Sequence, residues 1–339
     1  INGDASEPRF DLFHFDWSIC SWKTRCVLMQ KGIPWRSWLF SPGEHGNYQP
    51  AYVRLRSLGH PGGALVGEVF TGSTSAQSQG FDPLVVPTLV DRLKKKVVVD
   101  SKVICEYLEK EIPSPVLMPP AHEELVKKHL MLVDETPHMG MLYGLHLSDM
   151  VQQTPDKLVV AFAKLISTAH AGQIKSVEAY LADSSLPSDL RPLYEAKKKK
   201  TELARSRVGS GGTKEDYQDM LKKVATFLSE LENDLRATGG PFICGAECTM
   251  ADLVWHTSLL RLYELGFDGL FSEEKLPKVH QYAMRILRHE GFAQATYLWP
   301  YKPVTRNLRR LMAEKKPVQA FVMNLMSKMI LGGCSCCCL

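Results

Sequence analysis

The sequence carries little excess charge and few signs of metal, nucleic-acid or secretory chemistry. Its formal net charge is +4 over 339 residues, which is too small to indicate a nucleic-acid partner. Before residue 330 there is no Cys/His spacing typical of a metal site. No secretory signal is visible, and organelle targeting stays open because the chain begins at Ile1 instead of methionine. We therefore expect no metal and no nucleic-acid partner.

A disulfide framework is also lacking. Four of the nine cysteines gather at the C-terminus, and the others are scattered at Cys20, Cys26, Cys105, Cys244 and Cys248. Scattered, unpaired cysteines are typical of a reducing compartment, because disulfides persist mainly in oxidising ones. This pattern predicts a cytoplasmic or otherwise reducing location.

Length and periodicity predict two domains. A chain of 339 residues with 45% hydrophobic content is ample for a core. Strand-like alternation gives way after Pro113 to apolar residues at helical spacing, in the segments 123–133, 157–168, 174–181, 192–205, 214–236 and 250–265. We therefore expect an α/β domain over residues 8–113 and an all-helical domain over 120–303.

The most informative residue is Cys20, which is placed where a strand gives way to a helix. Residues 10–15 alternate as a half-buried strand does, and the next segment reads as a helix that is closed by Gly32. A cysteine in the first turn of a helix can have its pKa of about 8.5 lowered, because free N–H groups and the helix dipole stabilise the thiolate. Ser18 suits an N-cap and can donate a hydrogen bond to such a thiolate. In the other interpretation Ser18 only caps the helix and Cys20 only packs.

Two further signals lie between residues 85 and 101. Pro87 interrupts a strand pattern, as a proline does at a sheet edge or, with a cis peptide bond, in a tight turn that leaves neighbouring backbone free to pair. Asp100 and Ser101 precede an apolar-periodic segment, where they can cap a helix or hold the two charged ends of a small zwitterion.

Taken together in their order along the chain, these signals make residues 8–303 resemble the glutathione transferase family. The resemblance rests on the Ser-x-Cys-Ser-x-Lys start at Ser18, the Val-Pro-Thr-Leu strand, the acidic-Ser pair, and the segment 241–253, which ends in Thr-Met-Ala-Asp-Leu. It implies a thioredoxin-like N-terminal domain and an all-α C-terminal domain. Thr249 and Asp252 then form a structural capping box. Among glutathione-dependent enzymes, the start is similar to zeta-class maleylacetoacetate isomerases and to reductive dehalogenases of chlorinated hydroquinones, and the dehalogenases are the better match.

The resemblance also implies the site and its chemistry. Glutathione is the cosubstrate, the backbone of Val86 beside cis-Pro87 pairs with its cysteinyl part, and Asp100 and Ser101 bind its γ-glutamyl end. Ser18 stabilises the glutathione thiolate, which attacks a small apolar or aromatic electrophile, and Cys20 resolves the adduct by thiol–disulfide exchange. The alternatives are a glutathione-dependent cis–trans isomerase and a non-catalytic subunit or scaffold. A homodimer or a larger complex is consistent with any of them.

The helical part offers a second set of side chains near the expected thiol site. Its first helices carry His138 and His146, which we interpret as packing or surface residues and not as bases. The apolar residues between them fit either the core or the wall of a substrate site, namely Met139, Met141, Leu142 and Tyr143.

Two segments depart from the family pattern. One is an insertion at about residues 59–82, rich in Gly, Ser, Thr and Gln, which reads either as a lid beside the thiol site or as a partly disordered surface loop. The other is the tail 304–339, where basic residues precede an amphipathic helical pattern over 318–330 and the terminal cysteines. That helix is too short to span a bilayer. It fits a membrane-surface anchor through residues 306–339, with lipidated thiols at Cys334, Cys336, Cys337 and Cys338. Docking on protein and metal binding by the cysteines are the alternatives.

Overall fold

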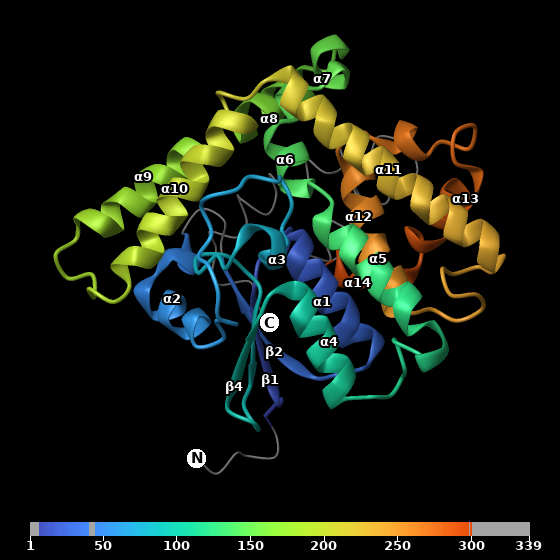
Figure 1. Ribbon diagram of the computed structural model, residues 1–339, viewed down its shortest axis with the longest axis horizontal. Helices are drawn as coiled ribbons and strands as arrows, with labels where there is room; N and C mark the ends of the chain where they lie inside the picture. The colour runs from blue at the N-terminus through green and yellow to red at the C-terminus, as the bar shows by residue number, and fades with distance from the viewer. Residues whose placement is uncertain (1–6, 41–44, 298, 300–339) are drawn as a thin grey trace.

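A four-stranded mixed sheet forms the centre of the N-terminal domain in the computed structural model, which describes residues 7–40, 45–297 and 299. Strands β1 (Phe10–His14) and β2 (Trp35–Leu39) run parallel, and β3 (Thr88–Asp91) and β4 (Lys96–Val99) form an antiparallel hairpin. The strand order is β2-β1-β3-β4. Helices α1 (Ile19–Gln30) and α4 (Ser101–Glu111) lie on one side of the sheet, and α2 (Pro50–Ser57) lies on the other (Figure 1).

Local signals explain where α1 begins and ends. Ser18 is its N-cap, and the Ser18 hydroxyl accepts a hydrogen bond from the Ser21 backbone N–H. Gly32 follows the helix with a φ of +60°, a conformation that glycine adopts without a Cβ penalty. The predicted strand and helix on either side of Ser18 are therefore confirmed.

The C-terminal domain is helical throughout its described part. Its longer helices are α5 (Glu123–Glu135), α8 (Lys157–Ser167), α9 (Ala169–Ala182), α10 (Arg191–Arg207), α11 (Lys214–Thr238), α12 (Met250–Glu264) and α13 (Pro277–Ile286). The shorter ones are α6 (His138–Tyr143), α7 (Asp149–Gln153) and α14 (Glu290–Ala295). Single-turn 3₁₀ helices lie at Gly46–Tyr48 (η1), Pro120–His122 (η2), Leu145–Leu147 (η3) and Asp268–Phe271 (η4). The predicted helical segments all correspond to helices of the structure.

Helix α12 is the centre of this domain and packs against α1. It is buried on nearly every side, as expected for a helix enclosed by others. The predicted capping box at its start is present, because the Thr249 N–H donates to Asp252 Oδ2 at 2.7 Å and the Thr249 side chain caps in return. Helix α12 therefore joins the two domains through its packed contact with α1.

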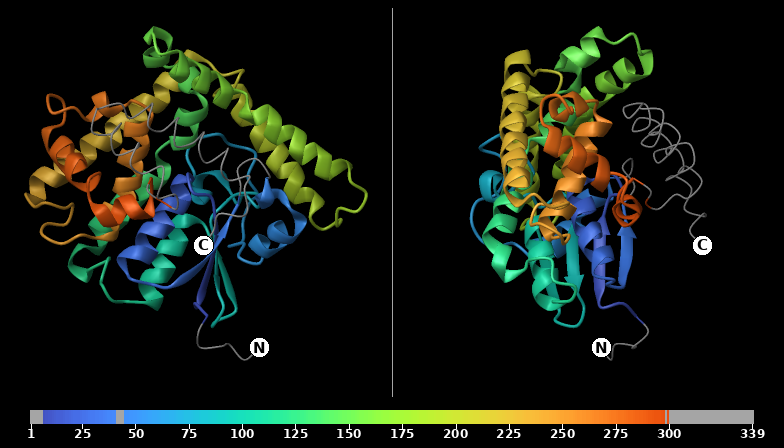
Figure 2. Two further views of the ribbon diagram at one scale, coloured as in Figure 1. Left: turned by 180° about the vertical axis from the view of Figure 1, so that it is seen from behind. Right: turned by 90° about the vertical axis from the view of Figure 1, so that its right-hand side faces the viewer.

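The α9–α10 pair extends beside α2 (Figures 1 and 2). A run of four lysines at 197–200 on a helix is by itself typical of a solvated helix end, but the structure agrees with this for only half of them. Lys198 and Lys199 reach the surface, but Lys197 is buried, and Lys197 and Lys200 both bind Asp82 at 2.9 Å. The difference arises because their partner lies more than 100 residues away in sequence, where helical spacing carries no information.

The insertion at residues 59–82 packs against both domains. It contains the short helix α3 (Ala76–Gln79), and the Val66 N–H donates to the Phe81 carbonyl at 3.0 Å, which closes residues 66–81 into a loop. Ser73, Ser75 and Gln79 are buried. These residues are therefore packed and not part of a surface loop, and their polar side chains are explained by buried hydrogen bonds.

The predicted tail helix, the terminal cysteine cluster and the membrane surface they suggest lie outside the described residues and stay predictions. Within residues 7–40, 45–297 and 299, no helix is long and apolar enough to cross a membrane. In the same part of the chain, no group of three or more His, Cys, Asp or Glu side chains is placed to hold a metal ion.

Candidate active site

The sheet register brings the predicted site residues to one edge of the sheet. Phe13 of β1 is opposite Thr88 of β3, which in turn is opposite Val99 of β4. Each residue of this row is next to a predicted part of the site in the chain. The β1–α1 turn comes soon after Phe13, Pro87 comes directly before Thr88, and Asp100 comes directly after Val99. Segments that are up to 86 residues apart in sequence, from Phe13 to Val99, thus meet at one end of three strands.

Cys20 lies in the first turn of α1 and is partly exposed, as is Ser18. The Ser18 hydroxyl oxygen accepts from Ser21 N at 3.3 Å, which leaves the hydroxyl proton to donate. Two other cysteines of this domain differ: Cys26 and Cys105 are buried, and burial raises the pKa of the Cys26 thiol to about 12. Of these three cysteines, Cys20 alone has both a helix N-terminus and access to a reactant.

The Val86–Pro87 peptide bond is cis, as predicted. Helix α2 holds the segment on both sides, since Tyr52 Oη donates to the Val85 carbonyl at 2.7 Å and Arg56 Nη1 donates to the Pro87 carbonyl at 2.5 Å. In the described residues, the backbone N–H and C=O of Val86 have no hydrogen-bond partner. They are available to pair with an extended peptide.

Asp100 is the N-cap of α4, and Ser101 is its first residue. The Asp100 carboxylate accepts from Lys102 N at 2.9 Å and, through its other oxygen, from Ala76 N of the insertion at 3.2 Å. Its backbone has a φ of +72°, a strained conformation for a residue with a Cβ that typically costs about 1–3 kcal/mol and clusters at functional sites. Burial and the nearby Asp134 carboxylate raise the pKa of Asp100.

Buried charges beside Cys20 were missed from the sequence. Lys23, one turn further along α1, is buried with its ammonium 3.4 Å from Asp134 of α5. Burial lowers the pKa of Lys23, but Asp134 and the nearby Cys20 thiolate raise it, and the net change is upward. Arg261 of α12 donates to the Trp17 carbonyl at 2.7 Å, and its guanidinium lies 4.7 Å from the centre of the Trp22 ring. Only the tertiary fold brings these cations to the start of α1.

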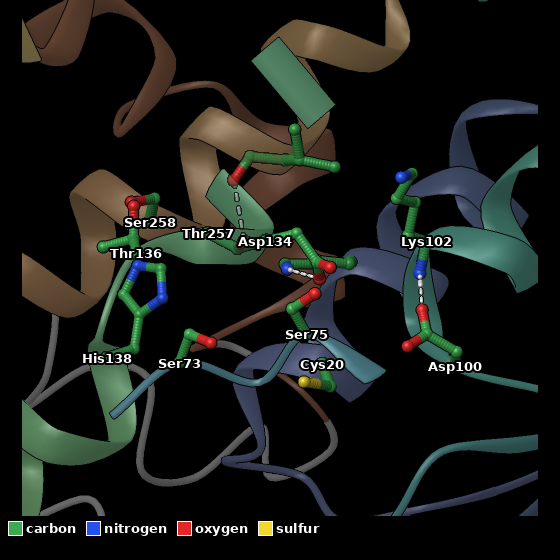
Figure 3. Close-up of polar contacts among 12 residues, drawn as sticks. Cys20, Ser73, Ser75, Asp100, Lys102, Asp134, Thr136, His138, Thr257 and Ser258 are labelled. Atoms are coloured by element: carbon green, nitrogen blue, oxygen red, sulfur yellow. Dashed lines mark hydrogen bonds and ion pairs between the residues drawn. The ribbon is translucent and has the colours of Figure 1, made fainter. Parts of the chain in front are cut away.

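A cluster of buried polar side chains lies where the insertion passes between the domains. Figure 3 shows Ser73 and Ser75 of the insertion near Cys20, with Asp134 and His138 of the helical domain around them. His138 is fully buried, and its Nε2 is 2.8 Å from Ser258 Oγ. The sequence-based interpretation of His138 as a packing residue therefore agrees with its burial but gave no sign of its position in this cluster.

The apolar residues predicted as core or substrate wall divide between the two roles. Met141 and Leu142 of α6 are fully buried in the hydrophobic core. Met139 and Tyr143 are partly exposed, so only these two have surface left for a wall.

Most of the chain matches known proteins. A family model for the glutathione S-transferase N-terminal domain matches residues 17–111, and one for the C-terminal domain matches residues 189–290. The sequence is 35% identical over 313 residues to 2,5-dichlorohydroquinone reductive dechlorinase of Sphingobium indicum, covering 91% of this chain and 88% of the relative. The chain belongs to the glutathione transferase family. The predicted fold family, its similarity to reductive dehalogenases and the prediction of a glutathione-dependent enzyme are thereby confirmed.

Solved structures agree with this glutathione transferase in fold. The beta-etherase LigF from Sphingobium sp. strain SYK-6 superposes with a TM-score of 0.55, at 17% identity, over 85% of this chain and 98% of its own. URE2P6 from Phanerochaete chrysosporium, solved in complex with oxidized glutathione, has a TM-score of 0.50 at 12% identity, over 85% of this chain and 94% of its own. At these identities the likeness is one of fold alone.

Proposed function

We propose that this glutathione transferase removes halogen reductively from a chlorinated hydroquinone, with Cys20 resolving a glutathionyl intermediate. The observation that carries the proposal is the placement of a partly exposed Cys20 at the start of α1, at the sheet edge that also bears cis-Pro87 and Asp100. The Sphingobium indicum relative supports the substrate class, because its name specifies 2,5-dichlorohydroquinone and reductive dechlorination.

Glutathione would lie along the edge described above. The free backbone groups of Val86 pair with its cysteinyl residue, Asp100 binds its ammonium, and Ser101 at the N-terminus of α4 binds its carboxylate. The Ser18 hydroxyl proton is placed to donate to the glutathione thiolate. Complexes of structural relatives with glutathione, such as that of URE2P6, are consistent with this cosubstrate.

The reaction balances with two glutathione molecules. The first thiolate forms a bond to the chlorine-bearing ring carbon, and chloride leaves, which gives an aryl thioether. The Cys20 thiolate then attacks the glutathionyl sulfur; the carbon–sulfur bond breaks, its electron pair takes a proton on carbon, and a Cys20–glutathione disulfide forms. A second glutathione thiolate releases Cys20 and leaves as glutathione disulfide. The ring carbon gains two electrons, and the two glutathione sulfurs lose them.

The helix N-terminus serves the resolving step. Attack on sulfur requires a thiolate, and the rate of exchange depends on how much of the attacking thiol is ionised. Lys23 and Arg261 add positive charge near Cys20, whereas the partners Asp134 and Glu264 limit its net effect.

Replacement of Cys20 by serine tests the proposal. We expect the wild-type enzyme to convert 2,5-dichlorohydroquinone and two glutathione molecules into the dechlorinated ring and glutathione disulfide. The C20S variant should instead accumulate the glutathionyl hydroquinone, measured by liquid chromatography and mass spectrometry. Cys248→Ser is the matched control, because Cys248 is also partly exposed but lies in the helical domain; it should leave the products unchanged.

Other results would reject the proposal in distinguishable ways. Dechlorination by C20S at the wild-type rate shows that Cys20 does not resolve the adduct. Isomerisation of an enedione that survives in C20S, without any dechlorination by the wild type, favours the isomerase alternative. Absence of glutathione binding in calorimetry favours a non-catalytic subunit.

A further inference from the structure

His138 presents an unused hydrogen-bonding atom in the polar cluster beside Cys20. Its ring is fully buried, and Nε2 is fixed by Ser258 Oγ at 2.8 Å. Its Nδ1 atom is inaccessible to solvent and has no hydrogen-bond partner among the described residues. Figure 3 shows this second ring nitrogen on the side of the ring that faces Ser73 and the cluster. A buried polar atom without a partner typically costs about 1–3 kcal/mol, and its retention calls for an explanation.

The surroundings of His138 select for a neutral hydroxyl group. Burial, and then the positive charges of Lys23 and Arg261, lower the pKa of His138 well below its usual value, so the imidazole is uncharged at neutral pH. In the tautomer whose Nε2–H donates to Ser258 Oγ, the Nδ1 atom carries a lone pair, and this is the tautomer that we assign to His138. Such a lone pair accepts a hydrogen bond from an O–H group. A carboxylate or phosphate offers no proton to such an atom.

The insertion determines when His138 is accessible. Gly72 of the insertion accepts a 3.0 Å hydrogen bond from Gly140 N on α6, two residues after His138. The two glycines allow this approach, because a Cβ on Gly140 would lie 2.3 Å from Met220 Sδ and 3.2 Å from Gly72 Cα. One backbone hydrogen bond contributes about 0.5–1.5 kcal/mol net. The insertion therefore covers α6 beside the buried His138, and a substrate can reach Nδ1 only when the insertion withdraws at this point.

We propose that His138 Nδ1 accepts the hydrogen bond of a substrate hydroxyl and thereby selects aromatic substrates that carry a free O–H group. The proposal deepens the function proposed above, because it names the group by which the hydroquinone is recognised. His138 orients the ring through its oxygen, while the chemistry at the ring carbon belongs to glutathione and Cys20.

Two side chains of similar shape separate this role from a structural one. The amide nitrogen of glutamine matches Nε2 of histidine, so His138→Gln keeps the contact with Ser258 and removes the acceptor at Nδ1. An asparagine amide lies near the place of Nδ1, so H138N retains a polar group there and should partly restore binding. His146→Gln is the matched control, because Nδ1 of His146 is also buried without a partner in the described chain but lies outside the cluster.

The test measures binding without turnover. Anaerobic calorimetry compares 2,5-dichlorohydroquinone with its dimethyl ether, which has no hydroxyl proton. We expect wild type and H146Q to prefer the free hydroquinone by about tenfold, the value of one hydrogen bond of typical strength. The preference should vanish in H138Q and return in part in H138N, with glutathione affinity unchanged in all variants.

An equal preference in wild type and H138Q would overturn the proposal, and so would a wild-type protein that binds both compounds equally. If H138Q does not fold, ¹⁵N spectra of histidine-labelled wild type give the answer. A ring nitrogen without a proton should shift when the hydroquinone is added and not when the ether is added; no shift overturns the proposal. Failure of the proposed function would appear separately, as a lack of dechlorinated product while the His138-dependent preference persists.

Discussion

Replacement of Asp82 by asparagine should destabilise the fold more than any surface substitution. Asp82 closes the insertion, and its carboxylate is buried against Lys197 and Lys200 of α10, each at 2.9 Å. The side chain of Lys197 is 8% exposed, whereas that of Lys200 is 23% exposed and can turn toward solvent. The asparagine keeps the shape of the side chain but removes the charge that compensates Lys197.

The magnitude follows from the uncompensated ammonium. Removing one partner of a buried ion pair typically costs about 3–5 kcal/mol, because the remaining charge has lost its water and its counter-ion. Lys200 adds little, since partly exposed pairs contribute about 0–1 kcal/mol. In the double variant D82N/K197M both charges are gone, so most of the loss should be recovered. The single variant K197M should cost less than D82N, because Asp82 keeps Lys200.

The pH dependence has a definite sign. Burial raises the pKa of Asp82, but Lys197 and Lys200 outweigh it and hold that pKa below its usual value of 3.8. A carboxyl group with a depressed pKa stabilises the fold above the pKa of the unfolded chain and loses this contribution as the pH falls. The penalty of D82N should therefore be full at pH 7 and shrink below about pH 4.

Urea unfolding measures these differences. The free energy of unfolding is obtained from tryptophan fluorescence and from circular dichroism, and the two transitions must coincide before a single value is assigned. A D82N protein within about 1 kcal/mol of wild type at pH 7 would refute the reasoning. So would a double variant that is less stable than D82N.

Two further predictions concern the packing of the helical domain. Gly140→Ala should weaken the docking of the insertion by roughly 1–3 kcal/mol, because the added Cβ clashes with Met220. The weaker docking should be measurable as faster proteolysis within residues 59–82. Gly172→Ala is the control, because its Cβ would enter open space, and it should leave the rate of proteolysis unchanged. Burial lowers the pKa of His256 to about 3, so its contribution to stability is present above its usual pKa of 6.5 and is lost as the pH falls. Between pH 7 and pH 4, the loss of this contribution lowers the free energy of unfolding by roughly 3 kcal/mol. The free energy of unfolding of His256→Gln, measured in urea, should therefore depend less on pH across that range.

Local signals in the sequence were sufficient to predict the helices and strands and to nominate the residues of the proposed glutathione site. The N-cap at Ser18, the glycine after α1, the proline before β3 and the capping box at Thr249 each act within a few residues, so each is readable without the fold. The strands then place Pro87 and Asp100 beside the start of α1, as the family resemblance implied.

The missed features depend on long-range contacts. Lys23 and Asp134 are 111 residues apart, and Lys197 and Asp82 are 115 apart, so no periodicity relates them. A lysine on a helix reads as solvated until its partner is known. The left-handed backbone of Asp100 was equally invisible, because the preference of that conformation for glycine argues against an aspartate there.

The two ends of the insertion meet at one side chain. Arg56 of α2 donates to the Asp82 carbonyl at 2.8 Å and to the Pro87 carbonyl at 2.5 Å, so the chain leaves and returns at nearly the same point. The entropy of closing such a loop rises only slowly with its length, by about 0.6 kcal/mol for each doubling. The segment between Arg56 and Asp82 is therefore a place where this fold can exchange one loop for another without moving the strand ends that carry the proposed glutathione site. This makes the segment a natural position for altering the proposed substrate site beside it.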